Sequence, residues 1–184
     1  MAVLQLRPRA ADTPADFDHP VGLLYACHER VRHFAGLVPK IAARLAQGGP
    51  DSAVREAAAS VLRYFDLAAQ LHHQDEEEDV FPALRAVLSG AEDAALASAI
   101  DRIEAEHRAL AASYAAVRPA LEALAAGQAA ALSRDTAEVF ATLYPAHAQA
   151  EEREVFAVLE ARLSAATLAQ IGRNMAARRG VSHV

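Results

Sequence analysis

Two segments of the sequence repeat one arrangement of imidazole and carboxylate side chains. The first begins at His72 and reads HHQDEEEDVF, and the second begins at His147 and reads HAQAEEREVF. Residues four apart on an α-helix lie about 40° apart around its axis and one turn apart along it. His72 and Glu76 can therefore approach one metal site, and so can His147 and Glu151.

Apolar neighbours indicate that these groups face the interior of the protein. Phe65 shares the helical stripe of His72 and Glu76, and Phe140 shares the stripe of His147. Carboxylates that are buried without partners cost several kcal/mol each, so they require compensation. A bound divalent or trivalent cation would supply it for both segments.

Two further histidines occupy matching places in the sequence. His28 precedes His72 by 44 residues, and His107 precedes His147 by 40. Each lies on an apolar helical stripe, so the chain consists of two similar helix pairs that each contribute one His and then a His-x-x-x-Glu. Four imidazoles and two carboxylates suit iron, which accepts mixed nitrogen and oxygen ligands.

At these residues the chain resembles the hemerythrin-like, or HHE cation-binding, family. The matching stretches are Cys27-His28-Glu29-Arg30, His72-His73-Gln74-Asp75-Glu76-Glu77, Glu106-His107 and His147 with Glu151-Glu152. The resemblance extends from about His19 to Gly180. It implies two irons bridged by two glutamates and an oxo or hydroxo group, with histidines at the outer positions. The implied ligands are His28, His72, Glu76, His107, His147 and Glu151.

One difference from the family concerns a fifth histidine. Oxygen-carrying hemerythrins have it one turn beyond the ligand of the third helix, where this sequence has Ala111. We therefore expect water, Glu104 or Tyr144 to fill one coordination position, which argues against reversible O2 carriage. His73 is left open as a ligand in place of His72 or beside it.

Three kinds of function are compatible with such a site. The first, which we favour, is a module that binds or senses O2, nitric oxide or iron. The second is a di-iron oxidase or peroxidase, or a factor that donates iron for the repair of iron–sulfur centres. The third, a ferritin-like carboxylate protein, requires two Glu-x-x-His motifs, and only Glu104 with His107 fits.

The elements that must position these side chains are helices. The sequence is 53% hydrophobic and only 5% aromatic, and it lacks the alternation of β-branched residues that is typical of strands. Helices are predicted at about residues 18–45, 52–88, 91–126, 134–163 and 165–178, with kinks at Pro39 and Pro119. We expect an all-α protein. Residues 18–180 should form an up-down-up-down four-helix bundle with a short additional C-terminal helix, preceded by a flexible N-terminal arm, residues 1–17.

Charge and hydropathy argue against several partners. The net charge of -6 disfavours nucleic acid, and no long uncharged apolar stretch is present to span a membrane. The single cysteine and the absence of a signal-peptide pattern indicate a cytoplasmic protein. The expected partner is a small diatomic ligand, O2 or nitric oxide, and a homodimer is left open.

Overall fold

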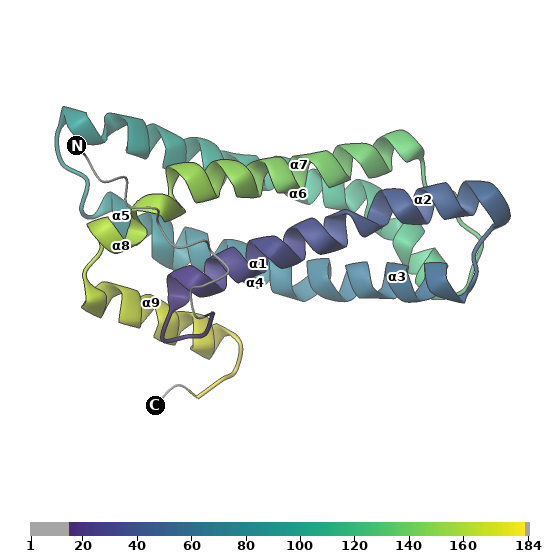
Figure 1. The fold of residues 1–184 in the computed structure, drawn as a ribbon, viewed down its shortest axis with the longest axis horizontal. Helices are drawn as coiled ribbons and strands as arrows, with labels where there is room; N and C mark the ends of the chain where they lie inside the picture. The colour runs from purple at the N-terminus through teal and green to yellow at the C-terminus, as the bar shows by residue number, and fades with distance from the viewer. Residues whose placement is uncertain (1–14, 183–184) are drawn as a thin grey trace, which may run out of the picture.

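The computed structural model describes residues 15–182, and every regular element in that part of the chain is a helix (Figure 1). The prediction of an all-α protein is therefore confirmed. Most of the expected N-terminal arm, residues 1–14, lies outside the described residues. Among residues 15–182, no helix combines the length and the apolar composition that a membrane span requires.

The first helical pass is divided at Gly36, earlier than expected. α1 covers Pro20–Ala35 and α2 covers Leu37–Gly48. The sequence predicted a kink at Pro39, which instead lies in the first turn of α2. Because proline has no N–H and its ring conflicts with the carbonyl four residues earlier, Pro39 disturbs the helix at Ala35. The interruption therefore falls three residues before the proline itself.

The second pass is a continuous helical run that contains two π-helical turns. Its parts are α3 (Ser52–Arg63), η2 (Tyr64–Ala68), α4 (Ala69–Asp75), η3 (Glu76–Val80) and α5 (Phe81–Arg85). Asp51 caps it, because its side chain accepts a hydrogen bond from the Val54 N–H at 2.9 Å. A π turn accommodates an extra residue in the helix, and such turns are frequent at functional sites. The two π turns flank α4, which carries the His72–His73 pair.

The remaining passes differ in regularity. After a short turn, η4 (Ala91–Asp93), α6 runs unbroken over Ala94–Ala125 and includes Pro119. α7 (Arg134–Glu154) begins at the predicted cap, Ser133, but ends earlier than expected. Beyond it lie η5 (Phe156–Val158) and α8 (Leu159–Arg162), and the chain closes with the predicted C-terminal helix, α9 (Ala165–Arg178).

The long helices lie alongside one another and form a bundle (Figure 1). α6 packs against both α3 and α7, while α1 and α2 pack against α7. α9 lies on the outside, against α1, α4 and η3. The N-terminal segment crosses α9 closely at Gly172, where a Cβ atom would lie 1.9 Å from the backbone oxygen of Phe17. Only glycine permits this crossing.

Two apolar clusters form the core, one toward each end of the bundle. The first includes Phe65 and Leu110, and the second includes Phe81 and Ile103. Polar residues interrupt the apolar stripes between them. On α6, for example, the buried His107 lies one turn after Ile103 and one turn before Leu110. The fold therefore places a layer of buried polar side chains between the two apolar clusters.

Candidate metal centre

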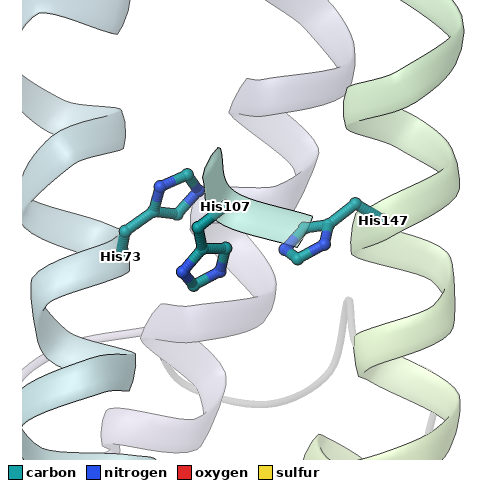
Figure 2. Close-up of side chains that lie close together, drawn as sticks. All are labelled: His73, His107 and His147. Carbon is teal, nitrogen blue, oxygen red and sulfur yellow. The ribbon is translucent and has the colours of Figure 1, made fainter. Parts of the chain in front are cut away.

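Seven side chains from α1, α4, η3, α6 and α7 converge in this polar layer. They form two groups, and within each group one ligand atom per residue lies within 4.8 Å of those of the others. The first group consists of His28, His72, Glu76 and Glu151, and the second consists of His73, His107 and His147. Figure 2 shows the second group, whose imidazoles approach one another from three different helices. All six residues implied by the sequence are gathered here, together with His73.

The two glutamates lie between the groups. Glu76 Oε1 is 2.9 Å from His72 Nε2, and Glu76 Oε2 is 3.5 Å from His107 Nε2. Glu151 repeats this arrangement, because its Oε2 is 3.2 Å from His28 Nε2 and 3.7 Å from an imidazole of the second group. Each carboxylate therefore contacts one histidine of either group, as a ligand shared by two ions would.

Every buried side-chain nitrogen or oxygen without a hydrogen-bond partner in residues 15–182 belongs to these groups. The nine atoms are the Nε2 of His28, His107 and His147, both ring nitrogens of His72, and both carboxylate oxygens of Glu76 and Glu151. Buried polar atoms are normally paired, because an unpaired one costs free energy. Cations bound between the imidazoles and carboxylates would partner these atoms, so the donor set fits a metal centre.

Burial shifts the pKa values of five of these side chains in the direction that favours their neutral forms. It raises the pKa of Glu76 well above its ordinary value and, with a smaller contribution from the Glu76 charge, raises that of Glu151 to about 8. It also lowers the pKa of His107 and of His147 to about 4, and lowers that of His73. Neutral imidazoles are the form that binds metals, and a cation would displace the carboxyl protons.

Three of the imidazoles donate their Nδ1–H to a carboxylate outside the two groups. These outer carboxylates are Glu152, which binds His28 at 3.0 Å, Glu77, which binds His107 at 2.5 Å, and Glu106, which binds His147 at 3.0 Å. Each bond keeps the proton on Nδ1 and turns Nε2 toward the centre, which is the usual support for a metal-binding histidine.

The sequence interpretation missed the outer carboxylates. Glu77 is not among the residues implied by the sequence, yet its partly exposed side chain binds His107. A signal was present, because each glutamate of the repeat is followed directly by another: Glu76 by Glu77, and Glu151 by Glu152. In both helices the second glutamate supports a histidine on a different helix.

His73 belongs to the second group rather than taking the place of His72. Its ring stacks on that of His107, with centroids 4.0 Å apart and planes 5° apart. Helix geometry explains how neighbouring histidines serve both groups. Glu76 is four residues after His72 and three after His73, so it lies between them around the helix.

The structure therefore gathers five imidazoles, the four implied by the resemblance and one more. The fifth comes from His73, which the sequence left open as a ligand, and not from the position of Ala111. Neither proposed substitute belongs to the two groups. The Glu104 carboxylate accepts a hydrogen bond from Arg85 at 2.6 Å, and the Tyr144 hydroxyl donates to the Leu110 carbonyl at 3.2 Å.

Three further acidic residues between positions 75 and 79 attach α9 to the second helical pass. Asp75 is fully buried and accepts hydrogen bonds from both Arg178 and Arg179, the latter at 2.6 Å. Arg178 also donates to Glu78 at 2.9 Å and to Asp79 at 2.8 Å. The contacts hold α9 directly against η3, the turn that carries Glu76.

Comparison with known proteins agrees with this geometry. The chain matches the hemerythrin HHE cation binding domain over residues 19–164, which includes all seven side chains of the two groups. It is also similar to an uncharacterized protein of Haemophilus influenzae. The two are 34% identical over 167 residues, which cover 91% of this chain and 94% of that protein.

Proposed function

The chain belongs to the hemerythrin HHE cation-binding family, and from this premise we propose that it is a non-haem di-iron protein that binds or senses O2 or nitric oxide. The nine unpartnered atoms of the two groups are the main support for this proposal. They are buried, they converge, and they combine imidazole with carboxylate. We also propose that the long helices follow the up-down-up-down order of a four-helix bundle.

The two groups would hold one iron each. His28 and His72 would serve the first ion, and the three imidazoles of the second group would serve the other, with Glu76 and Glu151 shared. Iron in such a site is a redox-active Lewis acid that can accept small ligands. The first group supplies two imidazoles and the second supplies three, so an ion held by the first group would have more room for an exogenous ligand.

The other residues orient the ligands and exclude water. The outer carboxylates hold the Nδ1 protons of three histidines, as described above. Phe156 stacks on the ring of His28, with centroids 4.9 Å apart and planes 13° apart. The six side chains inferred from the sequence retain between 0% and 6% of their accessible surface. A small, uncharged diatomic molecule suits a site that is this enclosed.

The proposal is tested by counting iron. Chelator-treated protein is reloaded with ferrous iron under nitrogen, freed of excess metal and assayed for iron per chain. We expect about two irons in the unmutated protein, fewer in His147→Ala and Glu151→Ala, and an unchanged number in His33→Ala, because His33 is exposed and outside both groups. Full retention of iron in both site variants would refute the assignment. Optical spectra recorded before and after exposure to O2 and to nitric oxide then test ligand binding.

One observation favours an alternative, a di-iron oxidase or peroxidase or a factor that donates iron. A cleft of about 470 Å³ reaches His73, which is more space than a diatomic ligand requires. Catalytic turnover of peroxide or of an organic substrate, or transfer of iron to an acceptor, would distinguish these functions from sensing.

A further inference from the structure

A cleft lies between the second helical pass and α6. Its volume is about 470 Å³, and the rings of Phe65 and Tyr144 are part of its lining. On the α6 side the lining residues are Tyr114, Arg118 and two small residues one turn apart, Ala111 and Ala115. Two larger side chains at these positions would narrow it. His73 lines the same cleft, so the space reaches the second group of the metal centre.

His73 differs from the other six side chains in its accessibility. They are buried, whereas His73 keeps an intermediate exposure. A cation that entered the cleft would therefore meet this imidazole before any other group of the centre. A neighbouring hollow of about 340 Å³ is a poorer route, because Arg30 and Arg63 line it and none of the seven side chains does.

An ion pair stands at the rim of the cleft. Asp66 Oδ1 accepts hydrogen bonds from Arg118 Nε at 2.9 Å and from the Tyr114 hydroxyl at 2.8 Å. Both members of the pair are partly exposed, with 38% of the Asp66 side chain and 44% of the Arg118 side chain accessible. Arg118 also pairs with Glu122, whose Oε1 lies 3.0 Å from Arg118 Nη1. The guanidinium therefore engages two carboxylates that would otherwise attract a divalent cation, and its own charge opposes the approach of one.

We propose that this cleft is the passage through which ferrous iron enters and leaves the centre. His73 is the first ligand that the ion meets inside, and the pair of Asp66 with Arg118 is the electrostatic barrier at the rim. The inference rests on the proposed function, since it requires that the two groups bind metal. It assigns a role in metal exchange to residues outside the ligand set, and so bears on whether the protein can donate iron.

The steric half of the proposal is tested by filling the cleft. The variant Ala111→Leu/Ala115→Leu is compared with Ala112→Leu/Ala116→Leu, which makes the same change at two exposed α6 residues that do not line the cleft. The probe is Co²⁺, whose uptake by metal-free protein is followed by visible absorption and whose release is followed after addition of excess chelator. We expect the first variant to slow uptake and release about tenfold and the second to leave both rates unchanged.

The electrostatic half is tested with a change of opposite sign. Arg118→Gln removes the rim cation and frees both Asp66 and Glu122, so Co²⁺ uptake should become several-fold faster, more so at low ionic strength. Arg134→Gln carries the same change of charge at the exposed start of α7 and should match the unmutated protein. Circular dichroism and the final Co²⁺ content check that each variant is folded and complete.

The outcomes separate this inference from the proposed function. If the unmutated protein and all variants bind no Co²⁺ or iron, the metal centre itself is refuted. If all bind the full amount but the alanine-to-leucine pair at the cleft exchanges metal at the unmutated rate, the passage is refuted and the centre stands. An unchanged rate in Arg118→Gln would overturn the role of the ion pair.

Discussion

Glu151 should destabilise the metal-free protein that it helps to make functional. Its carboxyl is fully buried, and its pKa is raised from 4.5 to about 8 by burial and, to a smaller extent, by the charge of Glu76. A raised folded-state pKa means that the stability is fully present below 4.5 and is lost as the pH rises through 8. Each pH unit above 4.5 lowers the free energy of unfolding by about 1.4 kcal/mol. At pH 7 the ionisation of Glu151 therefore costs the folded protein about 3 kcal/mol.

Substitution of Glu151 by Gln removes this ionisation while keeping the shape of the side chain. The new amide N–H groups remain unpartnered, which costs about 1–3 kcal/mol. We therefore expect metal-free Glu151→Gln to be more stable than the metal-free unmutated protein at pH 7, by a net gain of about 1 kcal/mol. With iron bound, Glu151→Gln should instead be less stable than the unmutated protein, because the variant lacks one of the two carboxylates that we propose bind both ions.

The assay is urea denaturation of chelator-treated protein, followed by circular dichroism. Glu152→Gln is the matched control. Although burial acts to raise the pKa of Glu152, hydrogen bonds from His28 and Arg32 lower it overall, so loss of its charge should cost about 1 kcal/mol. At pH 5 the advantage of Glu151→Gln should disappear. If the metal-free variant is less stable than the unmutated protein at both pH values, the ionised Glu151 carboxylate does not destabilise the fold and the reasoning is refuted.

Three further predictions follow from the same geometry. Between pH 7 and 8, the unfolding free energy of the metal-free protein should fall by about 1 kcal/mol, because Glu151 is protonated in the folded state only, while unfolded histidines, with pKa values near 6.5, are mostly neutral in this range. Iron-loaded protein should not show this fall. Removal of the fifth imidazole in His73→Ala should lower the iron content by about one per chain, and two retained irons would exclude His73 as a ligand. Loss of the outer carboxylate in Glu106→Ala should weaken iron binding about 10- to 100-fold in a chelator competition, whereas Glu104→Ala should have no effect, since Glu104 binds Arg85 instead of a histidine.

The helices and the six side chains implied by the sequence could be predicted because both depend on local periodicity. The spacing of His72 and Glu76, and of His147 and Glu151, is a property of a single helix and needs no knowledge of its neighbours. The apolar stripes around them indicate burial for the same reason. Because the same motif occurs in both halves of the chain, the sequence alone predicted that the two halves contribute to one buried polar layer.

Contacts between helices could not be obtained in this way. Periodicity identifies the residues on one stripe but not the stripe that they face on another helix. That is why the bond from Glu77 to His107 was not predicted, and why Asp75 was not linked to Arg178, which is 103 residues away in the sequence. The position of His73 is an intermediate case. The angular separation of His73 and Glu76 around the helix axis follows from the sequence alone. Only the packing of α4 against its neighbours shows that His72 faces one group of side chains and His73 the other. The sequence thus determined which side chains are buried together, and the tertiary structure decided how they pair, because pairing depends on the placement of whole helices.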